Sequence, residues 1–240
     1  MVSGLLLRGL IAGVLAGFLA AGFSFFAGEP PLERALAFEA STAEPSASEP
    51  ELVSRATQGG AGLFAAHILY GAAAGGFFSL AFAISFGRSN DLDPRALSGL
   101  LAIAGFVALV LVPELKYPAN PPGVGEAATI GARTALYFGM LAISLLTMIL
   151  AAMLAPFLVA RLGPWNGGLA CAAVFVLITA FAAVALPVVD EVPAGFPASV
   201  LWNFRMASLG ARAVFWAALG LSFGVLAEPW LKRLAHLRKA

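Results

Sequence analysis

Charged residues are scarce in this chain of 240 residues, and their scarcity excludes most soluble folds. Only 11% of the residues are charged, whereas a soluble domain carries roughly 25%. The formal net charge is +1, so no strong field draws the chain to nucleic acid. The single cysteine, Cys171, excludes an intramolecular disulfide. No P-loop, HExxH motif, nucleophile elbow or intramembrane carboxylate pair occurs, so the sequence predicts no enzyme.

Hydrophobic residues make up 60% of the chain, and they gather in runs long enough to cross a bilayer. The sequence therefore predicts an all-α fold, a polytopic membrane helix bundle that forms one transmembrane domain over residues 1–240. Six transmembrane helices are expected, at residues 5–27, 62–86, 97–113, 133–160, 168–187 and 207–227. The third of these is short and ends at Pro113.

Basic residues indicate the orientation of these helices. Arg88 and Arg95 flank one short loop, and a basic tail follows Trp230. Because cytoplasmic loops are enriched in lysine and arginine, both termini are expected in the cytoplasm. The first outer loop, residues 28–61, is then expected to hold a short amphipathic helix at 30–39 and a disordered part that begins at Ser41.

His67 is the one histidine expected inside the membrane. A polar residue at that depth is costly and is a functional candidate by default. Glycines surround it, and Tyr70 lies one helical turn later. Two interpretations stay open. His67 can bond across a tight helix contact, or it can serve as a metal ligand or proton relay.

Two Pro-rich stretches interrupt the apolar runs, at residues 112–138 and 186–216. Prolines prevent a continuous helix through the first stretch. Residues 131–137 also resemble residues 210–216, since an arginine and an aromatic residue lie four apart in both. The chain can therefore be read as repeated hairpins whose Pro-rich loops, 113–133 and 187–205, both face outward.

The two loops are expected to line a shared outer vestibule for a divalent cation. Oxygen donors with one imidazole suit a hard or borderline metal ion. A purely structural role for the loops, with Arg133 and Arg212 paired to the carboxylates, is the alternative. The candidate metal ligands are Glu114, Asn120, Asp190, Glu191 and His67. The candidate vestibule and loop residues are Tyr117, Pro118, Pro121, Pro122, Glu126, Arg133, Pro193, Pro197, Trp202, Arg205 and Arg212.

These same stretches resemble the CbtA family of bacterial cobalt transporter subunits. The resemblance covers about residues 5–228. It rests most firmly on Val-Pro-Glu-Leu-Lys-Tyr-Pro-Ala-Asn-Pro-Pro-Gly-Val-Gly (112–125), and also on Thr-Ile-Gly-Ala-Arg-Thr-Ala-Leu-Tyr-Phe (129–138), Leu-Pro-Val-Val-Asp-Glu-Val-Pro-Ala-Gly-Phe-Pro-Ala (186–198) and Leu-Trp-Asn-Phe-Arg-Met-Ala-Ser-Leu-Gly (201–210).

The resemblance implies cobalt uptake at the bacterial cytoplasmic membrane, with cobalt as the transported substrate and no tightly bound cofactor. It also implies a small single-span partner, CbtB, that carries a histidine-rich end. Relatives often have a histidine-rich first outer loop, whereas this loop holds no histidine, which favours metal capture by the partner. The alternative function is a non-transporting membrane scaffold that positions this metal-binding partner.

Overall fold

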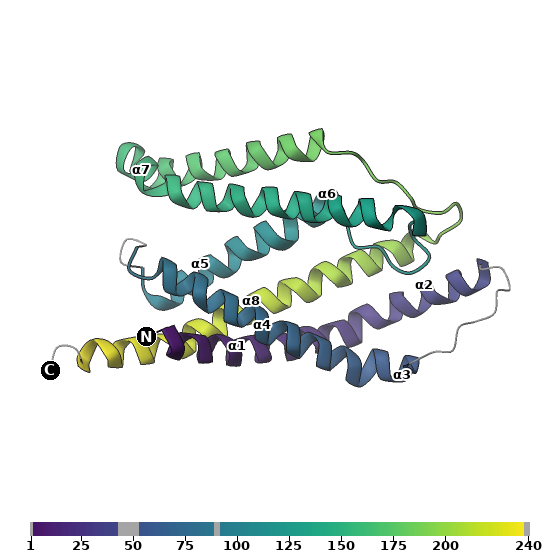
Figure 1. Ribbon diagram of the computed structural model, residues 1–240, viewed down its shortest axis with the longest axis horizontal. Helices are drawn as coiled ribbons and strands as arrows, with labels where there is room; N and C mark the ends of the chain where they lie inside the picture. Colours follow the sequence, from purple (N-terminus) through teal and green to yellow (C-terminus); the bar gives the residue numbers. More distant parts are fainter. Residues whose placement is uncertain (1, 43–52, 89–91, 238–240) are drawn as a thin grey trace. The chain divides into compact units, whose positions relative to one another are not determined.

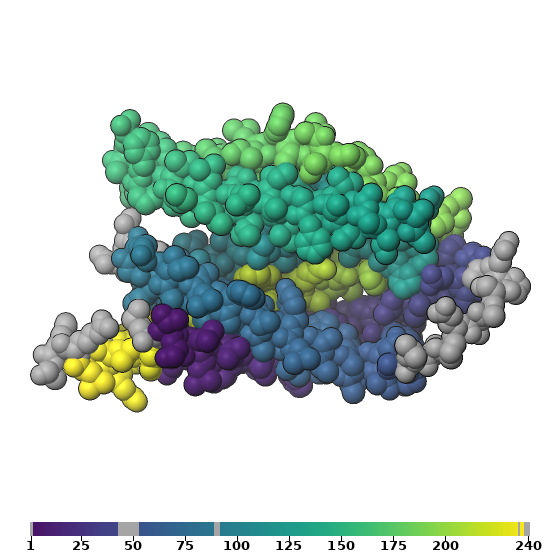
Figure 2. Space-filling model, viewed as in Figure 1, coloured from purple at the N-terminus to yellow at the C-terminus, as the bar shows by residue number. Residues whose placement is uncertain are grey.

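A computed structural model describes residues 2–42, 53–88 and 92–237 (Figures 1 and 2). These residues form helices, turns and loops, and no strand occurs among them. The all-α prediction is therefore confirmed. The elements are α1 (Val2–Phe23), η1 (Ser24–Gly28), α2 (Glu29–Thr42), α3 (Arg55–Thr57), η2 (Gln58–Gly62), α4 (Leu63–Ser85), α5 (Pro94–Phe106), η3 (Val107–Leu111), α6 (Val112–Lys116), η4 (Ala127–Thr129), α7 (Ile130–Ala185) and α8 (Ala198–Leu237).

Five helices in the described part of the chain are long and apolar enough to span a membrane, rather than the six expected. The expected helix at 133–160 and residues 168–185 of the next expected helix belong to one element, α7, which is continuous except for a kink at Gly163. The five candidates are Val2–Thr42, Arg55–Ser85, Pro94–Lys116, Ala127–Ala185 and Ala198–Leu234.

The α7 element turns back on itself at Gly163. This residue has φ +80° and ψ 166°, a conformation that interrupts a helix and that glycine adopts readily. A Cβ added at Gly167 would lie 2.6 Å from the Cα of Val159, and Met140 shares a buried cluster with Ala182. A straight helix of 56 residues would be about 84 Å long and would keep those residues far apart. The two limbs of α7 instead run side by side (Figures 1 and 2).

The chain divides into two compact units. Unit 1 comprises Met1–Gly105 and Ala198–Ala240, and unit 2 comprises Phe106–Pro197. Unit 1 therefore contains α1, α4, α8 and nearly all of α5. Unit 2 contains η3, α6, α7 and both irregular loops, 117–126 and 186–197.

Close backbone contact between α1 and α4 organises unit 1. Gly9, Gly13 and Gly17 lie one helical turn apart on α1, and they face the carbonyls of Gly75, Gly71 and His67. A Cβ at any of these three glycines would overlap the facing backbone. Since lipid supplies no hydrophobic driving force between helices, such close approach lets dispersion contacts hold the pair together.

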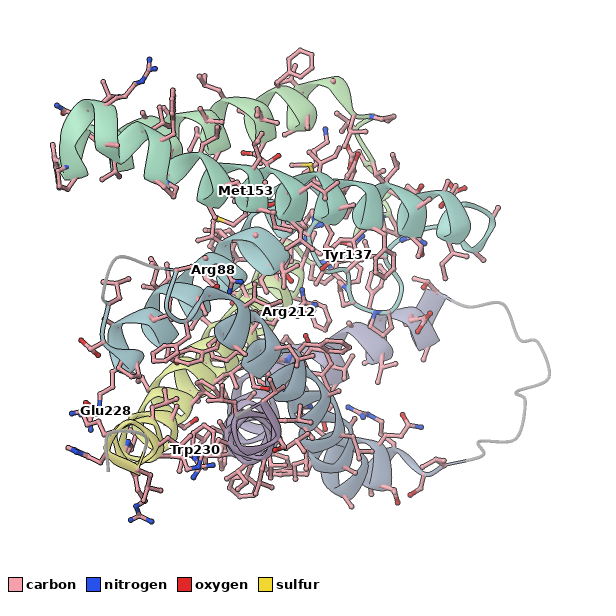
Figure 3. All side chains as sticks on the ribbon, turned by 60° about the vertical axis from the view of Figure 1, so that its left-hand side comes forward. Arg88, Tyr137, Met153, Arg212, Glu228 and Trp230 are labelled. Atoms are coloured by element: carbon pink, nitrogen blue, oxygen red, sulfur yellow. The ribbon has the colours of Figure 1, made fainter. Side chains whose placement is uncertain are left out.

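Polar contacts join α1, α5 and α8 near the end of α8 that holds Glu228 and Trp230 (Figure 3). Arg8 donates from Nε to the carbonyl of Leu226 at 3.0 Å, and its guanidinium lies 4.5 Å from the centre of the Trp230 ring. Glu228 forms ion pairs with Arg95 and Lys232. These contacts hold together the ends of α1, α5 and α8 at which the basic residues Arg8, Arg95 and Lys232 lie.

Unit 2 packs α6 against the hairpin of α7. Tyr117, Met140 and Ala182 are buried together, and side chains of α6 and of the loop at 186–189 pack around them. The large side chains on the other faces of α7 are exposed, as Phe181 and Val184 show at 75% and 86%. Exposed apolar side chains of this kind suit contact with lipid.

The third expected helix extends beyond Pro113 and ends at Lys116. Pro113 has no N–H to donate, and the wider π-helical turn of η3 before it lets the helix continue without that bond.

The second loop is shorter than expected, because α8 begins at Ala198. Residues 198–205 are therefore helical, and Trp202 and Arg205 are not loop residues. Residues 131–137 and 210–216 resemble each other in sequence but occupy different places in their helices. Gly131 lies at the start of α7, whereas Gly210 lies well inside α8.

The first outer loop, expected over residues 28–61, is largely helical where it is described. The expected helix at 30–39 lies within α2, which follows α1 through η1 without a break. Ser41 and Thr42 belong to α2, and the rest of the segment expected to be disordered falls in residues 43–52, outside the described residues.

Replacing Gly13 by alanine should destabilise the protein by about 1–3 kcal/mol, because the added methyl group overpacks the contact with Gly71. Thermal unfolding in detergent, followed by fluorescence-detected gel filtration, measures the loss. Gly22→Ala is the matched control, since a Cβ at that position of the same helix would have no described atom within 4 Å apart from its own stretch of helix backbone. Equal melting temperatures for the two variants would contradict close α1–α4 packing.

Candidate functional site

The two Pro-rich loops meet within unit 2. Tyr117 donates from its hydroxyl to the carbonyl oxygen of Pro187 at 2.8 Å, and the N–H of Gly125 donates to the carbonyl of Glu191 at 3.1 Å. Tyr117 is buried, and its bond to the exposed Pro187 holds one loop against the other. The loops therefore form one surface, although 70 residues separate Tyr117 from Pro187.

Proline and glycine shape the first loop. Pro118, Pro121 and Pro122 exclude helix, and the N–H of Val124 closes a turn on the carbonyl of Pro121 at 3.2 Å. Gly125 has φ +101°, and a Cβ there would overlap the Arg133 guanidinium. Only glycine lets the backbone turn this closely beneath the arginine.

The Glu191 carboxylate is the centre of the contact between the loops. Its Oε2 accepts hydrogen bonds from the Glu126 N–H at 2.9 Å and from the Thr129 hydroxyl at 2.8 Å. Arg133 pairs with the same oxygen at 3.2 Å and donates to the Glu126 carbonyl at 3.0 Å. We call these four residues, Glu126, Thr129, Arg133 and Glu191, the loop clasp.

The loop clasp stabilises the charged form of Glu191. The bond from the Glu126 N–H, then that from Thr129, and then the charge of Arg133 lower the pKa of this carboxyl group below its ordinary value of 4.5. Partial burial acts in the opposite direction and is outweighed. Glu191 is therefore ionised at neutral pH, and one of its oxygens accepts two hydrogen bonds and pairs with Arg133.

The other candidate ligands are spread over different environments. Glu114 is buried on α6, Asn120 is half-buried in the first loop, and Asp190 is exposed next to Glu191. No hydrogen bond or ion pair of Asp190 occurs among the residues that the structure describes. Within that same part of the chain, no three His, Cys, Asp or Glu side chains lie together as a set that could hold a metal ion. The ligand set stays a prediction.

His67 belongs to unit 1 and has two polar neighbours. Its Nδ1 lies 2.9 Å from the Leu63 carbonyl, and its Nε2 lies 3.2 Å from the Ser24 hydroxyl. Since a carbonyl oxygen only accepts, Nδ1 donates to Leu63, and Nε2 shares a hydrogen bond with the Ser24 hydroxyl. Gly17 packs on the His67 backbone. This arrangement fits a histidine bonded across a tight helix contact.

The remaining candidates lie in the second loop or in α8. Pro193 and Pro197 belong to the loop, where the carbonyl of Pro193 accepts from the Phe196 N–H at 3.1 Å. Trp202 is 63% exposed on the first turns of α8, and Arg212 lies partly buried well inside that helix (Figure 3). The structure thus brings Tyr117, Glu126, Arg133 and Glu191 together, but places Trp202, Arg205 and Arg212 in α8.

Sequence reasoning missed two hydroxyl residues, Thr129 and Ser24. Thr129 directly precedes α7, a position at which a threonine hydroxyl commonly forms a hydrogen bond. Its position in the sequence could therefore have marked it as a hydrogen-bonding residue. Nothing in the sequence pairs Ser24 with His67, because 43 residues separate them and the pairing follows from the α1–α4 contact.

Comparison with known proteins gives one family. The family model described as "Probable cobalt transporter subunit (CbtA)" matches residues 2–228, nearly the whole chain. No curated protein and no solved structure matches.

Replacing Glu191 by alanine should free the first loop, because two donors lose their shared acceptor and Arg133 loses its ion pair. We expect amide hydrogen exchange at Glu126 to become about tenfold faster, since its N–H is then no longer held. Asp190→Ala, at the exposed neighbouring carboxylate, is the control and should leave exchange unchanged. The same acceleration in both variants would contradict the loop clasp.

The loop clasp should also weaken in acid. The pKa of Glu191 is lowered when the loops are joined, so its stabilisation is complete above 4.5 and is lost as the pH falls through the lowered pKa. Amide exchange at Glu126, corrected for the intrinsic effect of pH, should show this step below pH 4.5. Glu191→Gln should remove the step, and a step that persists in this variant would assign it to another group.

Proposed function

The chain belongs to the CbtA family of probable cobalt transporter subunits, and from this premise we propose that it is the membrane subunit through which a divalent metal ion, cobalt, enters the cell. The ion enters from an outer vestibule formed by the Pro-rich loops in unit 2. The joining of these loops through Tyr117 and Glu191 is the observation that carries the proposal.

The chemistry of the joined loops supports a cation. Asp190 is exposed beside the loop clasp, and Glu114 places a carboxylate in the interior at the end of α6. Irregular backbone near a membrane is tolerated where it lines a water-filled cavity, and the loop carbonyls add oxygen donors there. Glu191 serves the loop clasp, and we assign the ion to the exposed carboxylate of Asp190 and the buried carboxylate of Glu114.

The proposed topology places both loops on the outer side. The first loop precedes the first limb of α7 and the second follows its second limb, so a hairpin that crosses the bilayer twice puts both on one side. With both limbs counted, an even number of crossings leaves both termini in the cytoplasm. Arg88, Arg161 and the basic tail then lie inside, in accord with the positive-inside rule. The membrane is the bacterial cytoplasmic membrane.

One observation favours the alternative function, a non-transporting scaffold. Within the described residues no cluster of metal ligands is formed, and the best-placed carboxylate, Glu191, is engaged in the loop clasp. A scaffold would position a partner that holds the metal. Either function requires a second subunit, which we propose to be a small single-span protein of the CbtB type.

Uptake of radiolabelled cobalt distinguishes the two functions. We expect cells without their own cobalt importers to accumulate cobalt only when this chain and its partner are both produced. Asp190→Ala and Glu114→Ala should each lower uptake about tenfold at unchanged protein level, because the permeating ion loses a carboxylate. Glu39→Ala, which removes an exposed carboxylate from α2, is the control. Uptake that needs the chain but tolerates both carboxylate variants would establish the scaffold instead.

A further inference from the structure

The interior of unit 2 contains buried hydroxyl groups, as does the phenylalanine-rich core of unit 1. Ser144 is fully buried, and Thr147 and Thr179 are 5% and 6% exposed. Ser144 and Thr147 lie on the first limb of α7, and Thr179 lies on the second. Both limbs of the α7 hairpin thus carry buried hydroxyl groups.

Ser144 differs from the other buried hydroxyl residues. Thr147 donates to the Ile143 carbonyl at 2.7 Å, and Thr179 donates to the Phe175 carbonyl at 2.8 Å. The buried serines of unit 1 also donate to carbonyls. Ser79 donates to the carbonyl of Gly76 and Ser98 to that of Gly220, each at 2.7 Å. The hydroxyl of Ser144 is buried and has no hydrogen-bond partner among the described residues.

An unpartnered hydroxyl inside a membrane protein is costly, because neither lipid nor apolar side chains can bond to it. A serine in a helix normally avoids this cost by donating to the carbonyl four residues earlier. For Ser144 that carbonyl belongs to Met140, and the bond is not made. Water or a bound ligand could supply the partner that the described residues do not.

The helix register connects Ser144 to the joined loops. Met140 is 1% exposed and packs with Ala182 across the hairpin and with Tyr117. One turn further along each antiparallel limb, the register brings Ser144 level with Thr179. Tyr117 in turn bonds to Pro187 in the second loop. A line of side chains that carry sulfur or oxygen thus leads from the loops to Ser144.

We propose that Ser144 lines a hydrated route through unit 2, along the seam between the two limbs of α7, and that the partly hydrated divalent metal ion travels along it. This inference rests on the proposed transport function and names its path. The thioether of Met140 and the hydroxyls of Ser144 and Thr179 are weak, neutral ligands for such an ion. Weak ligands suit conduction, because an ion must leave each site as readily as it enters.

Cysteine accessibility tests the route in the full chain produced with its partner. Cys171→Ala removes the native thiol, and Ser144→Cys then places one thiol at the buried position. The probe is a small methanethiosulfonate reagent that carries a quaternary ammonium group and enters only through water. Ser79→Cys and Ser98→Cys in the same background are matched controls, since both serines are buried and bonded to carbonyls.

We expect the reagent to modify the thiol at position 144 and neither control, and cobalt to slow this modification. Modification should then lower cobalt uptake about tenfold, because the attached group blocks the route. A variant that takes up cobalt but resists the reagent at position 144 would overturn the inference, as would equal modification of all three thiols. Selective modification in a complex that takes up no cobalt would support the hydrated route and refute the proposed cobalt transport.

Discussion

The fold of unit 2 depends on one carboxylate placed between two broken helices. Prolines at 118, 121 and 122 end the helix before α7, and the chain leaves helix again after Ala185, so backbone groups at both places need partners. The Glu191 side chain is such a partner for the Glu126 N–H. The same carboxylate accepts from the Thr129 hydroxyl and pairs with Arg133. Its charge is stabilised by those bonds, so the group that joins the loops is not readily available to a metal ion.

The two units are built on different physical principles. In unit 1, glycines on α1 and α4 bring two backbones into contact, and phenylalanines such as Phe82 and Phe223 fill a closely packed, largely apolar core. Its buried serines, Ser79 and Ser98, are bonded to carbonyls. In unit 2, the buried face of α7 carries hydroxyl residues, and α7 has few buried positions. A route for an ion fits the second environment better, since a closely packed apolar core offers an ion no ligands.

Apolar run length and family motifs made the helical membrane fold and the CbtA membership predictable from the sequence. Proline content also predicted a break in this stretch, although the helix ends at Lys116 and not at Pro113 as expected. The sequence did not reveal that α8 begins at Ala198, because residues 198–205 carry polar side chains and a preceding proline that resemble loop composition. It did not reveal the role of Glu191 either, since a pair of adjacent carboxylates suits a metal ligand and a hydrogen-bond acceptor equally well.

The sequence by itself determined the solvent in which this protein folds, because 60% hydrophobic residues in long runs cannot be covered in water. It also determined where helices cannot continue, because proline lacks the N–H that a helix needs. Only the tertiary structure decided which residues meet. The turn at Gly163 brings Met140 to Ala182, and the meeting of the loops brings Glu191 to Arg133. Such pairings depend on the path of the chain between distant residues, and no local sequence pattern predicts that path.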